Sequence, residues 1–223
     1  MSSSKARELL RRFTSCDIGD ALVKLKYPHG GFLDGIRLYS PDSQTRIFGP
    51  AVTVKMVESS DKSAPKLEKH FVDHNVEAGV MYIQQPKGLP SACWGGLMST
   101  RAQYLGAQGV VIDGRMRDIN EHKQFKFPAS LQFHVVEESI LGSNTFTRAS
   151  EVNIPLQFKD DLWIHPGDVL VGDADGVVAV PPSLTEQVVA LCQERAEVDE
   201  KMFGELRKGA AMGDLIRNVR KDK

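Results

Sequence analysis

The chain has 223 residues, which is enough for one large domain or two small ones with a hydrophobic core. Hydrophobic residues make up 41% of it and charged residues 26%, values typical of a globular protein in water. The formal charge of −1 gives no electrostatic reason to expect a nucleic-acid partner. No run approaches the roughly 18 consecutive apolar residues of a membrane span, so we expect no membrane partner.

The cysteines and the N-terminus bear on the compartment. Cys16, Cys93 and Cys192 lack the CxxC spacing of a structural zinc site, and free thiols fit a reducing compartment. Residues 1–15 lack the apolar core of a signal peptide. We therefore expect a cytoplasmic protein.

The first elements in chain order are predicted to be helical. A short helix is expected over residues 5–13. A second helix should follow Thr14, because Thr14 and Asp17 have the spacing of a capping box. Residues 27–45 are rich in Gly, Pro, Asp and Ser and predict an irregular connection, and the alternating pattern over 51–56 predicts a strand.

The middle of the chain alternates between the two kinds of element. We expect a helix over 65–75, a strand over 78–84, a helix over 95–107 and a strand over 110–112. A short helix should begin near Asp118.

Strands and turns dominate from 130 to 180, with a strand expected over 131–136. Asp175 and Gly176 form a tight-turn pair between the apolar runs 169–171 and 177–180, which predicts a hairpin.

Ser183 and Glu186 then have capping-box spacing, which predicts the start of a long helix. Gly209 is a plausible residue to end it. Helices alternate with strands in the first half and the second half is rich in strands, a pattern that favours a compact α/β layer structure. No GxGxxG motif follows a strand, so dinucleotide binding has little support.

Glycines open the helix predicted after Trp94, and they suggest an anion site. The amides of Gly95, Gly96, Leu97 and Met98 would lie in the first helical turn, where unpaired donors can hold a carboxylate or phosphate. The alternative is that the glycines only allow a tight entry turn.

Arg117 and Asp118 follow a strand and the Gly114 turn, where α/β folds often place ligand groups. An aspartate oxygen suits Mg²⁺ or Mn²⁺, and a guanidinium suits an oxyanion. Adjacent residues on an extended segment point in opposite directions, so a shared site requires a turn there. The alternatives are a surface ion pair or Asp118 as a helix N-cap.

Two more polar residues would share the face of a helix that begins at Asp118. Glu121 and His122 lie three and four positions on, and with Asp118 they could form a metal cluster. A solvated helix face is the commoner outcome for such a set.

Taken together, the motifs resemble a known family. The matching pieces are residues 16–22, 49–53, 94–118, 166–168 and 172–181, in this order along the chain. They resemble the family that joins the regulator of ribonuclease activity A (RraA) to the class II 4-hydroxy-4-methyl-2-oxoglutarate aldolases. The resemblance covers about residues 14–210. It leaves residues 1–13 as an N-terminal helix or arm and 211–223 as a polar, basic tail.

The resemblance implies a fold and a site. The fold would be an α/β swivelling domain of the β/β/α type, assembled as a homotrimer or a dimer of trimers with active sites at subunit interfaces. Asp118 would hold a divalent metal, Mg²⁺ or Mn²⁺, and Arg117 would contact the keto oxygen of a bound pyruvoyl group. Amides around Gly95, Leu97 and Met98 would hold its carboxylate.

The implied activity is that of a metal-dependent lyase acting on 2-oxo acids, by retro-aldol cleavage, oxaloacetate decarboxylation or both, because both reactions pass through the pyruvate enolate. This chain departs from the family's aldolases at Gly96, where they usually carry an acidic residue. The acid–base role would then fall to metal-bound water, to Glu200 of a neighbouring subunit, or to Glu121. We expect Gly96→Asp to raise turnover by restoring the acid.

Two other functions stay open. One is a non-catalytic regulator that binds another protein, as the namesake branch inhibits a ribonuclease. The other is a related lyase or hydratase-type enzyme with altered acid–base residues, for which Gly96 is the reason.

Overall fold

The structure of the protein is a computed structural model that describes residues 3–38, 46–125, 128–132 and 145–220. Its helices are α1 (Ser3–Leu10), α2 (Ser15–Lys24), α3 (Gly96–Tyr104), α4 (Ile119–Phe125), α5 (Thr185–Leu206) and α6 (Met212–Leu215). Short 3-10 turns are η1 (Pro28–Gly31), η2 (Phe71–His74) and η3 (Pro182–Leu184), and Ile216–Arg220 is a turn of π-helix. The strands are β1 (Ile36–Leu38), β2 (Ile47–Glu58), β3 (Val80–Gln84), β4 (Gly109–Asp113), β5 (Ala129–Gln132), β6 (Thr147–Val152), β7 (Leu156–Lys159), β8 (Leu162–Ile164), β9 (Val169–Gly172) and β10 (Val177–Val180).

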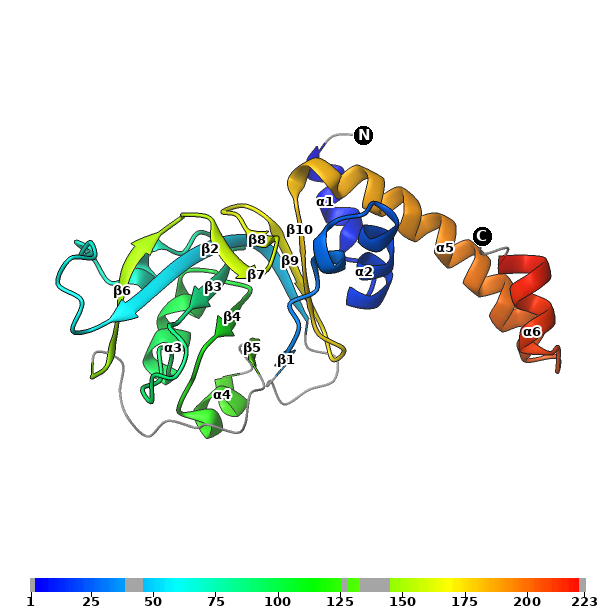
Figure 1. The fold of residues 1–223 in the computed structure, drawn as a ribbon. Coiled ribbons are helices and arrows are strands. Elements are labelled where there is room, and N and C mark those ends of the chain that lie inside the picture. The colour runs from blue at the N-terminus through cyan, green and yellow to red at the C-terminus, as the bar shows by residue number, and fades with distance from the viewer. Residues whose placement is uncertain (1–2, 39–45, 126–127, 133–144, 221–223) are drawn as a thin grey trace.

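The main sheet is organised around β2, the longest strand (Figure 1). Its strand order is β1-β5-β4-β3-β2-β9-β10, and β6 also pairs with β2. The pairs β2–β3, β3–β4 and β4–β5 are parallel, whereas β9, β10 and β6 run antiparallel to their neighbours. The parallel strands β3 and β4 are almost wholly buried, as expected for strands covered on both faces.

A separate hydrophobic cluster packs on each face of the sheet. On one face, Trp94, Phe71 and Met116 pack with residues of β2, β3 and β4 next to α3. On the other face, the β7–β8 hairpin packs Leu162 and Ile164 against the sheet. A third cluster joins α1, α2 and α5 to β9 and β10. The α/β fold class is thus confirmed as a layered structure.

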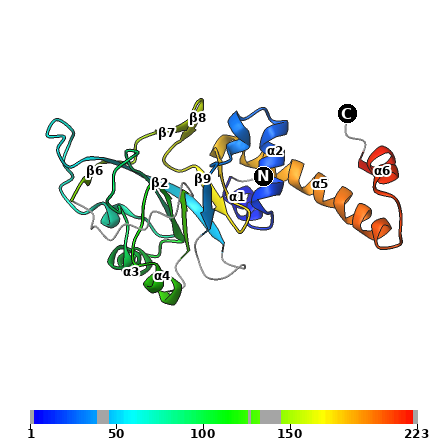
Figure 2. The ribbon, with the colours of Figure 1, turned by 60° about the horizontal axis from the view of Figure 1, so that its bottom comes forward.

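Helix α5 runs away from the body of the molecule, as the two views agree (Figures 1 and 2). Its first half contacts α1 and α2, and α6 and the π-helical turn pack against it near its far end. Residues 212–220, in the segment expected to be a polar tail, are thus helical, and Leu215 is buried. Among the described residues, no helix combines the length and apolar character needed to cross a bilayer.

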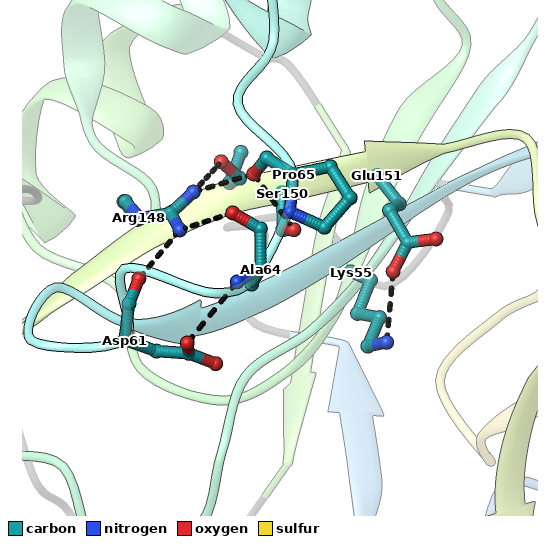
Figure 3. Close-up of polar contacts among 8 residues, drawn as sticks. Lys55, Asp61, Ala64, Pro65, Arg148, Ser150 and Glu151 are labelled. Carbon is teal, nitrogen blue, oxygen red and sulfur yellow. Dashed lines mark hydrogen bonds and ion pairs between the residues drawn. The ribbon is translucent and has the colours of Figure 1, made fainter.

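Arg148 on β6 fastens the loop that follows β2 (Figure 3). Its guanidinium donates hydrogen bonds to the carbonyl oxygens of Asp61 at 2.7 Å, Ala64 at 2.9 Å and Pro65 at 2.7 Å. The Ser150 hydroxyl donates to the same Pro65 oxygen at 3.0 Å. Beside this cluster, Lys55 and Glu151 form a cross-strand ion pair at 2.8 Å.

One predicted helix and one predicted capping box are wrong, whereas the long helix expected after Ser183 is present as α5. The helix expected over 65–75 is irregular except for η2, because the Pro65 carbonyl bonds to Arg148 and Ser150 rather than to a helical amide. No capping box forms at Ser183, since η3 covers that position and α5 begins at Thr185 with no side-chain cap.

Other predictions are confirmed or fall partly outside the structure. The Thr14–Asp17 capping box is present in full, and β9 and β10 form the expected hairpin. The connection over 27–45 contains β1, which the sequence did not indicate. Positions 133–136 of the expected strand 131–136 lie outside the described residues.

Candidate functional site

A pocket of about 220 Å³ lies where three segments meet. Its walls come from η2, from the segment that leads into α3, and from the turn after β4. They include His70 and Val72, then Ala92, Trp94, Gly95, Leu97 and Met98, and finally Arg117 and Asp118. The pocket therefore joins five of the residues proposed from the sequence, and it adds His70, Val72, Ala92 and Trp94.

Two of the wall segments lie side by side in a short parallel ladder. Cys93 N–H donates to the Arg115 carbonyl at 2.9 Å, Trp94 bridges to Met116, and Arg117 N–H donates to the Trp94 carbonyl at 3.0 Å. These bonds hold the entry to α3 against the segment that follows β4. The glycines and the Arg–Asp pair are neighbours in space for this reason.

Asp118 supplies the turn that a shared site requires. Its φ of 64° lies in the left-handed region, which costs an L-residue about 1–2 kcal/mol, although aspartate tolerates it better than most. As a result, the adjacent side chains of Arg117 and Asp118 border the same pocket, with 3.5 Å between Arg117 Nε and Asp118 Oδ2. Both side chains are partly exposed, at 39% and 33%.

Gly95 makes room for this pair. A Cβ at position 95 would lie 2.6 Å from Asp118 Oδ2 and 3.2 Å from Arg117 Nε, closer than side chains pack. Gly95 has an extended φ of −157°, which any residue can adopt. A side chain at position 95 would therefore displace the Arg117–Asp118 pair, and this proximity, not backbone conformation, favours glycine there.

Two carboxylate groups lie close to Gly96. Its N–H donates to Asp118 Oδ2 at 2.9 Å. A Cβ built on Gly96 would overlap the carboxylate of Glu121, which reaches over from α4. An acidic group thus lies beside position 96, where the family resemblance implies an acidic residue.

The first-turn amides of α3 are only partly open. Gly96 N–H bonds to Asp118, and Met98 N–H bonds to the Gly95 carbonyl at 3.1 Å. The structure shows no partner for the N–H groups of Gly95 and Leu97 among the described residues, and both residues border the pocket. An anion at this helix start would be held by these two amides.

Glu121 is exposed and His122 is buried. The prediction that both lie on a solvated helix face is therefore wrong for His122. His122 is 2% exposed, and burial lowers the pKa of its imidazole below 6.5. Glu121 is exposed. The sequence did not reveal this difference because His122 is buried by α3, which is distant in the chain.

The donor set fits a hard, partly hydrated cation. Among the described residues, no group of three or more His, Cys, Asp or Glu side chains is arranged to hold a metal ion. Mg²⁺ is usually bound through one or two carboxylates and keeps several waters. Asp118, partly exposed at the pocket wall with Glu121 near it, matches that pattern and does not match a closed zinc site.

Glu200 is not brought to the pocket within one chain. It is exposed on the outer half of α5, a helix that packs on α1, α2 and α6. Its role at a neighbour's site stays a prediction. His70, by contrast, borders the pocket although its spacing in the sequence gave no sign of it.

Comparison with known proteins identifies the family. The model of the RraA-like family, described as Aldolase/RraA, matches residues 15–179, which is most of the chain. The protein therefore belongs to the RraA-like family.

Individual relatives agree with this assignment. A protein of Halalkalibacterium halodurans named "Putative 4-hydroxy-4-methyl-2-oxoglutarate aldolase" is 28% identical over 70% of this chain and 69% of its own. Two crystal structures share the fold at lower identity. One is an uncharacterized Pseudomonas syringae protein, 24% identical, with a TM-score of 0.80 over 95% of this chain and 96% of that chain. The other is Streptomyces coelicolor RraAS2, described as an unusual member of the RNase ES inhibitor RraA family, 20% identical, with a TM-score of 0.73 over 92% and 96%.

Proposed function

We propose that the protein is a divalent-metal-dependent lyase that breaks a C–C bond next to a 2-oxo acid group. Its reactions would be retro-aldol cleavage of 4-hydroxy-2-oxo acids, decarboxylation of oxaloacetate, or both. The observation that carries this proposal is the left-handed turn at Asp118, which brings a carboxylate and a guanidinium from adjacent residues to one pocket. The aldolase name of the Halalkalibacterium relative supports it.

The pocket can orient a 2-oxo acid at both of its oxygen groups. The N–H groups of Gly95 and Leu97, at the positive end of α3, would hold the substrate carboxylate. The Arg117 guanidinium would donate to the neighbouring keto oxygen. Arg117 makes its ion pair through Nε, so its terminal nitrogens can point to a ligand.

Cleavage of the C–C bond leaves its electron pair on the pyruvoyl fragment as an enolate. Arg117 stabilises the negative charge that develops on the former keto oxygen. Asp118 is the residue that would hold a divalent cation, Mg²⁺ or Mn²⁺, and such a cation would supply Lewis-acid stabilisation of negative charge in the pocket. Retro-aldol cleavage and decarboxylation share this enolate, so one site can perform both.

Retro-aldol cleavage also requires a base to take the proton of the 4-hydroxyl group as the new carbonyl forms, whereas decarboxylation releases CO₂. In both reactions a proton must then reach the enolate carbon. The Glu121 carboxylate lies where a side chain at position 96 would begin, and Glu121 is exposed, so it can exchange protons with solvent. Glu200 of a neighbouring subunit is the other candidate. Helix α5 projects from the body (Figure 1), as an arm that reaches another subunit would, in a homotrimer or a dimer of trimers.

The test is release of pyruvate from oxaloacetate and from a panel of 4-hydroxy-2-oxo acids, with Mg²⁺ or Mn²⁺ and with EDTA. We expect activity to require the metal and to fall by about a hundredfold or more in Asp118→Asn, which keeps the shape of the side chain but loses its charge. Asp20→Asn on the exposed side of α2 is the matched control and should be unaffected. Full activity in EDTA or in Asp118→Asn would contradict the proposal.

The same experiment separates the two alternative functions. A protein-binding regulator would release no pyruvate from any substrate in the panel. Its contact surface would include the exposed apolar residues of α3, Leu97 at 86% and Tyr104 at 81% exposure. A related lyase or hydratase would require the metal and Asp118 but would convert a different 2-oxo acid.

A further inference from the structure

Behind the pocket, a ring of hydrogen bonds begins and ends at Arg117. Arg117 N–H donates to the Trp94 carbonyl at 3.0 Å. The indole Nε1–H of Trp94 donates to Ser99 Oγ at 2.7 Å, and Ser99 Oγ lies 3.0 Å from His122 Nδ1. His122 Nε2 lies 3.1 Å from the carbonyl oxygen of Arg117, which closes the ring.

The direction of each bond follows from its partners. A carbonyl oxygen only accepts, so His122 Nε2 carries a hydrogen and donates to Arg117. In the neutral imidazole Nδ1 then accepts, so the Ser99 hydroxyl donates to it while accepting from the indole. Every member has a partner in one consistent arrangement.

Three residues of the ring are buried. Trp94 is 1% exposed, Ser99 0% and His122 2%. In such a place the loss of one member leaves the others unpaired, because no solvent replaces the missing partner. The ring is therefore more rigid than the same bonds at a surface.

The ring fixes the orientation of the peptide plane that precedes Asp118, and with it the backbone conformation of Asp118. The carbonyl held by His122 belongs to the Arg117–Asp118 peptide, whose orientation sets φ of Asp118. On the other side, the Asp118 carbonyl accepts the N–H groups of Glu121 at 2.9 Å and His122 at 3.2 Å. The left-handed residue is held between two anchored peptides, both of which involve His122.

We propose that His122 is a positioning residue that, through Ser99 and Trp94, holds the Arg117–Asp118 turn and so directs both side chains into the pocket. His122 does not border the pocket and is not a catalytic residue. The proposal adds a residue to the site of the proposed function and rests on that function only for its effect on turnover.

The first experiment tests the ring without using activity. With ¹⁵N-labelled histidine, the imidazole spectrum of the full-length protein should show His122 neutral with its hydrogen on Nε2. Ser99→Ala should alter that signal and shift the backbone resonances of Arg117 and Asp118. Thr100→Ala, which removes the next hydroxyl on α3, should leave them unchanged. A hydrogen on Nδ1, or unshifted Arg117 and Asp118 resonances in Ser99→Ala, overturns the proposal.

The second experiment measures binding and turnover. His122→Phe keeps a ring but loses both hydrogen bonds, and His122→Gln keeps a donor near the Nε2 position. We expect His122→Phe to lower kcat on oxaloacetate and the affinity for Mn²⁺ alone by about tenfold or more, with KM changed less, and His122→Gln to recover part of both. Thermal unfolding checks that each variant folds.

The outcomes distinguish the two proposals. If the wild-type protein binds no Mn²⁺ and converts no 2-oxo acid, the proposed function fails, and the NMR result alone decides the positioning role. If the wild-type protein is active and His122→Phe keeps its kcat and Mn²⁺ affinity, the positioning role fails and the proposed function stands.

Discussion

Arg117 and Arg148 show how the same side chain serves two purposes. The Arg148 guanidinium is occupied by the carbonyls of Asp61, Ala64 and Pro65, which fasten a loop to β6 (Figure 3). Arg117 forms one long ion pair with Asp118 and borders a pocket. A guanidinium bonded to backbone oxygens stabilises the fold, whereas one with free donors at a cavity can bind a ligand.

Substitution of Arg117 should separate activity from stability most clearly. We expect Arg117→Ala to lower kcat for 2-oxo acid cleavage by about a hundredfold, the scale for loss of one oxyanion donor. The side chain is 39% exposed, so the melting temperature should change little. Steady-state kinetics and thermal unfolding check this, and a large loss of stability with unchanged kcat would reverse the roles assigned to the two arginines.

Substitution of Arg148 should do the opposite. Arg148→Ala removes three charged hydrogen bonds and should lower the free energy of unfolding by about 2–4 kcal/mol. Denaturant titration measures this effect. The kcat of the folded variant should stay within about twofold of wild type, and a greater kinetic loss would mean that the loop after β2 takes part in the site.

Gly96 and Glu121 form a second pair to test. Glu121→Ala should lower turnover by about tenfold if its carboxylate stands in for an acid at position 96. The gain first expected from Gly96→Asp now depends on Glu121, because the new Cβ would overlap that carboxylate. We expect the double variant Gly96→Asp/Glu121→Ala to turn over faster than Glu121→Ala alone. Equal rates would show that an acid at this place is not used.

The smallest expected effect is on the pH dependence of the free energy of unfolding. Burial holds the pKa of His122 below its unfolded value of 6.5, so protonation favours the unfolded chain. This histidine's contribution is fully present above pH 6.5 and is lost as pH falls through that value towards the lower folded pKa. Unfolding free energies between pH 7.5 and about 5.5 should show a slope that His122→Gln reduces. The same slope in that variant would assign it to other groups.

Several local features could be predicted because neighbouring residues in the chain determine them. The Thr14–Asp17 capping box, the β9–β10 hairpin and the strands β3 and β4 depend on short-range hydrogen bonding or on runs of apolar residues. The residues of 94–118 that border the pocket were also named as candidates from the sequence, because they stand in an order that resembles the family.

Other features could not be predicted because their partners are far away in the sequence. The helix expected over 65–75 does not form, because Arg148 and Ser150 bind the Pro65 carbonyl from β6. His70 joins the pocket only because η2 lies beside the entry to α3.

The sequence by itself determined which groups stand in the candidate site: a carboxylate, a guanidinium and helix-start glycines within one segment. The tertiary structure decided whether they could act together. It placed Asp118 in a left-handed turn, put the Glu121 carboxylate against Gly96 and closed a buried ring through Ser99 and His122. Those features depend on the packing of α3 against α4, and such contacts form only after the chain has folded.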